Sequence, residues 1–207
     1  MGMLVDGIWH DDDSRLVDET GRLRRPQSAF RNWITPDGAA GHTGEDGFRA
    51  EPGRYHLYIA RACPWAHRAS LLRELKGLQQ IVGLSVTHWL MADRGWTFEP
   101  GPGVSPDPFY GVETLWQLYV RADPTYTGRV TVPVLWDRQR ETIVSNESAD
   151  IIRMFNSAFD EVGALPGDYA PRALLGEIDA LNDRIYDGLN NGVYKAGFAT
   201  SQSAYEA

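Results

Sequence analysis

Cysteine is nearly absent from this sequence, because Cys63 is the single cysteine among 207 residues. One thiol cannot close a disulfide within the chain, and such cysteine usage is typical of a reducing compartment. Long apolar runs are missing as well, since no stretch approaches the roughly 18 residues that a membrane-spanning helix needs. The opening residues, MGMLVDGIWHDDDSRL, lack the charged-then-apolar layout of a signal peptide. We therefore expect a cytoplasmic protein with no membrane partner.

Positive charge is in the minority, with 20 Lys and Arg against 28 Asp and Glu. The formal net charge is −8 and the isoelectric point is near 5.1. A net anion is not drawn to nucleic acid or to an anionic membrane, so we expect no nucleic-acid partner. The remaining composition, 43% hydrophobic and 11% aromatic, is that of a globular protein. The aromatic residues could line a ligand pocket or pack in the core.

Metal-binding arrangements are also scarce. Cys63 and His67 stand four residues apart, which is a ligand spacing on a helix. The chain has no second cysteine and no histidine cluster to complete a tetrahedral site. The HDDD stretch at 10–13 could bind a cation, but an acidic, solvated turn is the alternative. We predict no metal.

Residues 1–53 are rich in Gly, Asp, Arg and Pro and show no sustained hydrophobic period. We interpret them as an extended, loop-rich N-terminal arm. Four apolar side chains could anchor this arm to a core: Ile8, Trp9, Phe30 and Trp33.

Residues 54–160 predict an α/β domain. We expect strands at 55–60, 81–90, 132–137 and 141–145, and helices at 64–77, 112–123 and 146–159. Pro64 begins the first helix, Gly77 ends it, and Asn146 is the expected cap of the third. The order β-α-β-α-β-β-α predicts a small mixed sheet with helices packed on it.

A helical pattern begins at Pro171 and runs through 171–207. The sequence stops within what resembles a further helix. A helical domain that ended there could not close its own core, so we expect only the first part of such a domain in this chain.

Cys63 falls between the first predicted strand and the first predicted helix. Unpaired backbone N–H groups and the helix dipole meet at a helix start and stabilise an anion there. The pKa of a free thiol is about 8.5, and helix starts can lower it to roughly 3.5–7.5. His67 and Arg68, one turn on, could add positive charge. The alternative is an inert, buried cysteine.

The chain from residue 28 to 207 resembles a known family through several stretches taken together. They are ARACPWAHRASLLRELKGL, DRGWTF, GRVTVPVLWD, IVSNESADIIRMFN and NNGVYKAGFA. The strand, the CPWA at a helix start, the VP of the hairpin and the ES of the third helix resemble the thioredoxin-fold domain of glutathione transferases. In detail the chain is similar to the glutathionyl-hydroquinone reductases, the Xi class. The resemblance implies an α/β thioredoxin-like N-terminal domain, followed by an all-α C-terminal glutathione-transferase domain that is present only in its first part.

The resemblance also implies an activity. Such a protein would be a glutathione-dependent thiol reductase that removes glutathione from glutathionyl-hydroquinones, with Cys63 as the catalytic nucleophile and no metal. Position 66, where a C-x-x-C motif would place a second thiol, holds alanine. The Cys63–glutathione disulfide would therefore be resolved by a second glutathione. Tyr194 matches a tyrosine of the aromatic substrate pocket and is the candidate general acid. A homodimer is implied on the same grounds.

Five residues would bind glutathione on this resemblance: Trp96, Arg129, Val132, Glu147 and Ser148. A cis peptide bond before Pro133 would expose the Val132 backbone to the ligand's cysteinyl backbone. Glu147 and Ser148 would hold the γ-glutamyl ammonium and carboxylate, Arg129 the glycyl carboxylate, and Trp96 would close over the ligand. Each also has a structural alternative: a loop anchor, a solvated charge, an edge strand or a helix-start charge. Tyr194 could likewise simply pack within the helical domain.

Two competing functions remain open. A conjugating transferase would activate the thiolate of glutathione with a Tyr or Ser hydroxyl near the first helix, but positions 61–67 hold no hydroxyl. A non-catalytic binding or scaffold protein could keep the same fold without an activated thiol.

Overall fold

The structure is a computed structural model that describes residues 2–11 and 17–206. The chain divides into two units, one of residues 1–11 and 28–168 and the other of residues 12–27 and 169–207. Part of the HDDD stretch lies outside the described residues. Within the described part, no helix is both long enough and apolar enough to cross a membrane.

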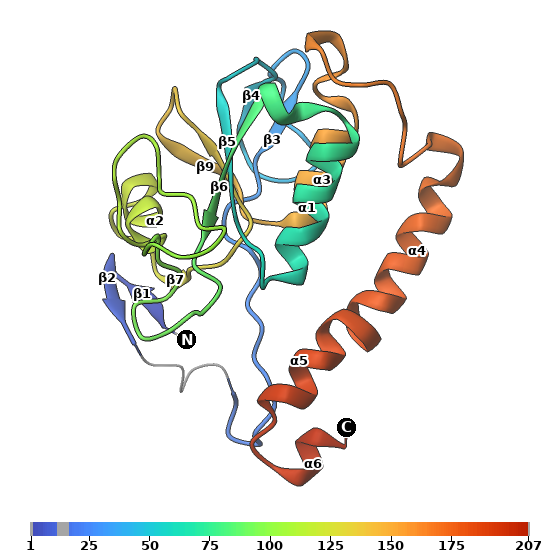
Figure 1. The fold of residues 1–207 in the computed structure, drawn as a ribbon. Helices are drawn as coiled ribbons and strands as arrows, with labels where there is room; N and C mark the ends of the chain where they lie inside the picture. Colours follow the sequence, from blue (N-terminus) through green and yellow to red (C-terminus); the bar gives the residue numbers. More distant parts are fainter. Residues whose placement is uncertain (1, 12–16, 207) are drawn as a thin grey trace. The chain divides into compact units, whose positions relative to one another are not determined.

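A four-stranded mixed sheet forms the centre of the first unit (Figure 1). Its spatial order is β6 (Val82–Thr87), β5 (Tyr55–Ala60), β8 (Val134–Asp137) and β9 (Thr142–Ser145). β5 pairs parallel with β6 and antiparallel with β8, which pairs antiparallel with β9. All six residues of β5 are buried, as expected of a strand covered on both faces.

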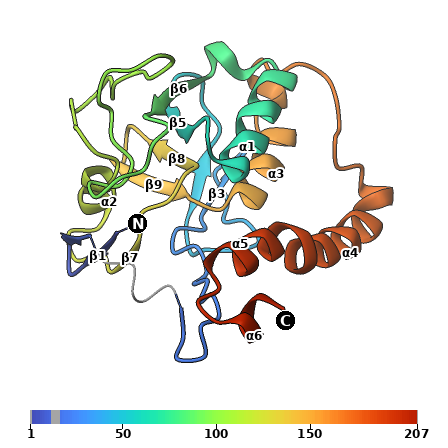
Figure 2. The same cartoon turned by 60° about the horizontal axis from the view of Figure 1, so that its bottom comes forward.

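Three helices cover this sheet. α1 (Pro64–Leu75) and α3 (Ser148–Ser157) pack side by side on one face, and α2 (Trp116–Ala122) lies on the other (Figure 1 and Figure 2). The predicted order β-α-β-α-β-β-α is therefore confirmed. A β5-α1-β6 crossover on a parallel strand pair leaves the start of α1 at the end of β5, which positions Cys63.

Aromatic side chains fill the core between these layers. Trp136, Tyr55, Tyr58 and Tyr119 are among the largest fully buried side chains. Core packing thus accounts for a substantial part of the aromatic content.

The N-terminal segment is more regular than a loop-rich arm. β1 (Met3–Val5) pairs with β2 (Ile8–His10) and with β7 (Gly128–Arg129), and β3 (Trp33–Thr35) pairs in parallel with β4 (Gly47–Arg49). These strands are only two or three residues long, too short for a hydrophobic period to reveal.

The expected anchors of this segment are confirmed for three of four residues. Trp9, Phe30 and Trp33 pack against the core. Ile8 is 64% exposed, so its predicted anchoring is wrong. It lies on the outermost strand of a small sheet, where its side chain faces outward.

The cap of α3 also differs from the prediction. Glu147, not Asn146, is the cap: its Oε1 accepts a hydrogen bond from the backbone N–H of Ala149. The side chain of Asn146 is used over a longer range, because its Oδ1 accepts from the backbone N–H of Phe30 and its Nδ2 donates to the hydroxyl of Tyr119.

The second unit is helical. It comprises a 3₁₀ turn (Arg172–Leu174), α4 (Leu175–Ile185), a π-helical turn (Tyr186–Asn190), α5 (Asn191–Phe198) and α6 (Gln202–Tyr205). The described part of residues 12–27 joins this unit through backbone contacts. The N–H of Thr200 donates to the carbonyl of Gly21 at 3.1 Å, and Ser201 Oγ donates to the carbonyl of Thr20 at 2.9 Å.

Candidate active site

Cys63 lies where the sequence predicts it, at the N-terminal end of α1. It is the N-cap residue, with extended backbone angles (φ −96°, ψ 115°), and Pro64 follows at the first helical position. Its backbone N–H donates to the carbonyl of Ala60, the last residue of β5, at 3.0 Å. The side chain is half-buried, and Sγ lies 3.5 Å from the carbonyl oxygen of Val132.

The start of α1 provides backbone groups that can stabilise an anion beside Cys63. The first-turn N–H groups of α1 have no carbonyl partner one turn earlier, and the helix dipole adds positive potential at the same end. A helix start can stabilise a thiolate, the nucleophilic form of cysteine, whereas the Val132 carbonyl accepts from the protonated S–H form. His67 is exposed on the next turn. No group of three or more metal-ligating side chains occurs among residues 2–11 and 17–206.

Val132, in the segment that leads into β8, is the partner of Cys63. The peptide bond between Val132 and Pro133 is cis, which confirms that expectation. The preceding residue, Thr131, is held through its backbone: its carbonyl accepts from the Tyr119 hydroxyl at 2.9 Å, and its N–H donates to the same oxygen at 3.2 Å. The Val132 carbonyl thus faces the sulfur from a buried segment whose preceding residue is hydrogen-bonded to Tyr119.

Glu147 and Ser148 meet at the start of α3. The Glu147 carboxylate accepts from the Ser28 hydroxyl at 2.9 Å and from the Ala149 N–H at 3.1 Å. Its side chain is 23% exposed, whereas the residue Ser148 is only 2% exposed. A fixed carboxylate beside a helix N-terminus can bind an ammonium group, and the helix end can bind a carboxylate.

Arg68 connects α1 to this corner. Its guanidinium donates two hydrogen bonds to Ser148 Oγ, from Nε at 3.0 Å and from Nη2 at 2.8 Å. Nη2 also lies 3.7 Å from Glu147 Oε1, and the guanidinium carbon lies 5.3 Å from the ring centre of Trp65. The sequence indicated charge at this position but not this contact, which depends on α1 and α3 packing side by side.

Trp96 and Arg129 lie in the connections that frame the sheet. Trp96 is half-buried between β6 and α2, packs against the core, and accepts a backbone hydrogen bond from Leu115 at 2.8 Å. Arg129 belongs to β7 and pairs with Met3, and its carbonyl accepts from the Tyr126 hydroxyl at 3.0 Å.

Tyr194 lies in α5 of the second unit and is half-buried. Its ring stacks on Phe198, with centroids 6.3 Å apart, and the guanidinium carbon of Arg25 lies 5.1 Å from its centre.

Sequence reasoning missed Ser28, which holds Glu147, and Tyr119, which holds Thr131. It named Asn146 as a cap but missed its contacts with Tyr119 and Phe30. Only the fold brings these residues together, because Ser28 and Glu147 are 119 positions apart. No local signal in the sequence marks these long-range contacts.

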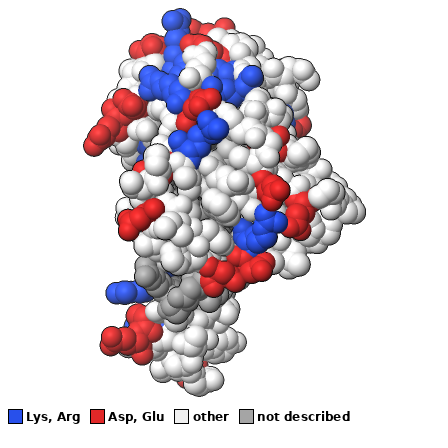
Figure 3. Space-filling view, turned by 90° about the vertical axis from the view of Figure 1, so that its left-hand side faces the viewer, with Lys and Arg blue, Asp and Glu red and all other residues white. Residues whose placement is uncertain are grey.

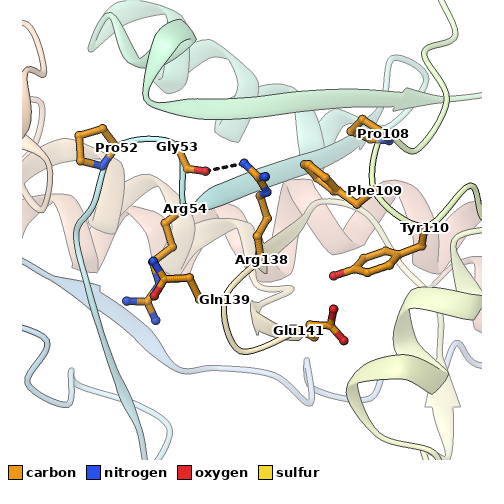
Figure 4. Close-up of a pocket in the computed structure, with 9 residues that line it drawn as sticks. All are labelled: Pro52, Gly53, Arg54, Pro108, Phe109, Tyr110, Arg138, Gln139 and Glu141. Carbon is orange, nitrogen blue, oxygen red and sulfur yellow. Dashed lines mark hydrogen bonds between the residues drawn. The ribbon is translucent and has the colours of Figure 1, made fainter.

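A hollow of about 520 Å³ occurs at the other end of the strands (Figure 4). It is lined by Arg54, which precedes β5, by the β8–β9 turn, and by Phe109 and Tyr110. Arg138 in this hollow already has partners within the protein: it donates to the Gly53 carbonyl at 2.7 Å and stacks on Phe109. Cys63 follows the opposite end of β5, so this hollow is separate from the thiol.

On the face drawn in Figure 3, Lys and Arg side chains gather at the top of the view with Asp and Glu among and beside them, and both signs occur further down. Arg94 bridges Glu99 and Glu113, and Arg121 pairs with Glu141. Such exposed pairs leave little uncompensated positive charge around them.

Comparison with known proteins shows which proteins the chain is similar to. Residues 62–158 match the family model described as "Glutathione S-transferase, N-terminal domain". The chain is 59% identical over 207 residues to the glutathionyl-hydroquinone reductase YqjG of Escherichia coli K12, and 51% identical over 206 residues to the glutathionyl-hydroquinone reductase PcpF of Sphingobium chlorophenolicum. Each alignment covers 100% of this chain and 63% of the relative, so the chain spans a little under two thirds of their length.

Solved structures agree with this comparison. The glutathione-bound structure of YqjG from Escherichia coli K-12 superposes with a TM-score of 0.88 at 57% identity, over 99% of this chain and 61% of that one. A Xi-class glutathione transferase from Natrialba magadii superposes with a TM-score of 0.84 at 44% identity, over 100% of this chain and 60% of that one. The thioredoxin-like sheet with Cys63 at the start of its first helix, and identity over the whole chain, make this protein similar in sequence and fold to the Xi-class glutathione transferases.

Proposed function

We propose that this protein is a glutathione-dependent reductase that removes glutathione from glutathionyl-hydroquinones. In the first step the Cys63 thiolate attacks the sulfur of the substrate. The carbon–sulfur bond breaks, the aromatic carbon takes the electron pair and a proton, and hydroquinone leaves. Cys63 is then joined to glutathione through a disulfide.

A second glutathione completes the cycle. Its thiolate attacks the glutathione sulfur of the mixed disulfide, forms oxidised glutathione and returns the Cys63 thiolate. Two glutathione sulfurs are oxidised and one aryl–sulfur bond is reduced, so no other electron donor is required.

The position of Cys63 carries this proposal. It is the one thiol of the chain, it caps the N-terminus of α1, and its sulfur lies beside the Val132 carbonyl. A hydroxyl at this point would instead suit a conjugating transferase, which activates the thiol of glutathione. A nucleophilic sulfur suits disulfide formation, and relatives at 59% and 51% identity carry the name glutathionyl-hydroquinone reductase.

The same proposal assigns the glutathione-binding residues. The Val132 backbone pairs with the cysteinyl backbone of glutathione, as an added strand would. Glu147 binds the γ-glutamyl ammonium, and Ser148 with the first N–H groups of α3 binds its carboxylate. Arg129 binds the glycyl carboxylate, and Trp96 closes over the ligand.

Tyr194 is proposed as the general acid that protonates the leaving hydroquinone. A phenol can donate a proton at neutral pH and pack against an aromatic substrate. In this arrangement residues 54–160 form the glutathione-binding domain, residues 1–53 an arm and residues 171–207 a helical part that bears the second substrate. We also propose a cytoplasmic homodimer, from the cysteine usage and the resemblance to this family.

A stoichiometry assay tests the activity. The protein is incubated with a glutathionyl-hydroquinone and glutathione, and hydroquinone and oxidised glutathione are quantified together. We expect both products in equal amounts from the wild type and neither above background from Cys63→Ser. Thioether formation with an aryl halide, without hydroquinone release, would instead indicate a conjugating transferase, and glutathione binding with no product would indicate a binding protein.

A further inference from the structure

The corner where α1 meets α3 is covered by Arg68. Ser148 is only 2% exposed, whereas the side chain of Arg68, whose guanidinium lies on the Ser148 hydroxyl, is 31% exposed. A carboxylate that approaches this corner therefore meets the guanidinium before it can reach the hydroxyl.

Arg68 is held in a defined orientation. Two hydrogen bonds to Ser148 Oγ fix one edge of the guanidinium, and the face of Trp65 lies 5.3 Å away. A planar guanidinium held in this way is pre-organised for a carboxylate, more so than an ammonium on a flexible stem.

Arg68 also determines whether the Ser148 hydroxyl can act as a hydrogen-bond donor or acceptor toward a ligand. Oγ accepts from Nε and from Nη2, which occupies both of its lone pairs. What the hydroxyl can still offer is its own hydrogen. Ser148 is therefore a donor toward any ligand, which favours a carboxylate and disfavours an ammonium.

Glu147 provides the opposite charge at a short distance. Its Oε1 lies 3.7 Å from Arg68 Nη2, and the Ser28 hydroxyl and the Ala149 N–H orient the same carboxylate. An anion and a cation side by side match a group that carries an ammonium and a carboxylate on one carbon. In glutathione only the γ-glutamyl end has both, because the glycyl end has a carboxylate alone.

We propose that Arg68 is a specificity-determining residue of the glutathione site, where its guanidinium binds the γ-glutamyl α-carboxylate while Glu147 binds the ammonium. The pair selects an α-amino-acid zwitterion over a simple carboxylate or a simple amine. This inference rests on the proposed function, since it assumes that glutathione binds at this corner.

Affinity measurements with three peptides test it. The full 207-residue chain carries Cys63→Ser, so that no disulfide forms, and Kd is measured by titration calorimetry. The peptides are glutathione, 4-aminobutyryl-cysteinyl-glycine, which lacks the γ-glutamyl carboxylate, and glutaryl-cysteinyl-glycine, which lacks the ammonium. We expect glutathione to bind at least about tenfold more tightly than the 4-aminobutyryl peptide, because hydrogen bonds to a charged group are lost.

Arg68→Gln in the same background should reduce the affinity ratio between the two peptides to about threefold or less, mainly by weakening the binding of glutathione. The glutaryl peptide should stay weaker than glutathione in this variant, because Glu147 is unchanged. The matched control is Arg31→Gln. The Arg31 side chain is 32% exposed and pairs at 2.7 Å with Asp150, which lies on α3 like Ser148. Its loss should leave the affinity ratio between glutathione and the 4-aminobutyryl peptide unchanged.

Arg68→Lys covers the case in which Arg68→Gln does not fold. Lysine keeps a charge but cannot hold Ser148 and a carboxylate in one plane, so the ratio should fall to an intermediate value. An unchanged ratio in the folded Arg68 variants overturns the inference and leaves the proposed function standing. Failure of the Cys63→Ser parent to bind glutathione at all contradicts the proposed function, and the inference falls with it.

Discussion

The sulfur of Cys63 lies 3.5 Å from the carbonyl oxygen of Val132. This contact joins the N-terminus of α1 to the segment that enters β8, so the thiol and a backbone acceptor stand at one point of the fold. A carbonyl oxygen has two lone pairs and can accept a ligand N–H as well as the S–H. A peptide thiol whose backbone pairs with Val132 would therefore be delivered beside Cys63.

The position of Cys63 at a helix start predicts an acidic thiol. Alkylation by iodoacetamide should show an inflection well below pH 8.5 in the folded protein, because the helix N-terminus stabilises the thiolate. The same chain in urea serves as the control and should show an inflection near the free-thiol value. An inflection at or above pH 8.5 in the folded protein would favour a binding or scaffold role.

Loss of the Tyr194 hydroxyl should slow one half of the cycle only. We expect Tyr194→Phe to reduce the rate of hydroquinone release by roughly 10²–10⁴-fold, the usual range for a general acid. Reduction of a preformed Cys63–glutathione disulfide should keep its rate, because a thiolate leaves without protonation. Single-turnover measurements separate the two steps.

Tyr205 offers a matched control for this experiment, because it is a 61% exposed tyrosine of the same unit. Tyr205→Phe should leave both steps unchanged. Equal rates for Tyr194→Phe and the wild type would remove Tyr194 from the mechanism.

The hydroxyl of Tyr119 supports the neighbours of two residues that we propose as glutathione contacts. It donates to the Thr131 carbonyl at 2.9 Å and accepts from Asn146 Nδ2 at 3.1 Å, next to Val132 and Glu147 respectively. Tyr119→Phe leaves these buried polar groups unsatisfied, so the free energy of unfolding should fall by about 1–3 kcal/mol and the Kd for glutathione should rise.

Tyr110→Phe is the control for Tyr119→Phe. Its hydroxyl accepts from Trp136 Nε1 at 3.3 Å and lines the hollow at the other end of the strands (Figure 4). It should lower stability without changing glutathione affinity. The same rise in Kd for both variants would mean that stability alone explains the Tyr119 effect.

Burial of His56 makes the stability depend on pH. The residue is 5% exposed, its Nε2 lies 2.8 Å from Ser85 Oγ, and burial lowers its pKa from 6.5 to about 4. Between these values the unfolded chain takes up a proton that the folded protein does not. The free energy of unfolding should therefore fall by about 3 kcal/mol from pH 6.5 to pH 4 on account of this group.

Urea unfolding at several pH values measures this effect. His56→Gln should reduce the slope of stability against pH in this window, and His10→Gln, at an exposed position, should not. An identical slope for His56→Gln and the wild type would contradict the assignment.

The order of elements could be predicted because each rests on local chemistry. β5 is a short aromatic and β-branched run, and α1 begins at Pro64 and ends before Gly77, whose φ is +65°. The cap of α3 could not be predicted with the same success. Asn146 has a good capping side chain, but it is drawn to Phe30 and Tyr119, partners 116 and 27 positions away.

The candidate site likewise contains residues that could be predicted from the sequence and contacts that could not. Cys63 could be found from its place between a strand and a helix, and Val132, Glu147 and Ser148 from the resemblance. The contact of Arg68 with Ser148 spans 80 positions and exists only because α1 and α3 pack together. Contacts of that kind follow from tertiary packing, which periodicity and capping patterns do not encode.

Intact mass spectrometry tests the central claim most directly. The wild type and Cys63→Ser are exposed briefly to a glutathionyl-hydroquinone without free glutathione. We expect the wild type alone to gain the mass of one glutathione joined by a disulfide, and added glutathione to reverse the change. A folded wild-type protein that binds glutathione but forms no adduct would contradict a mechanism through Cys63.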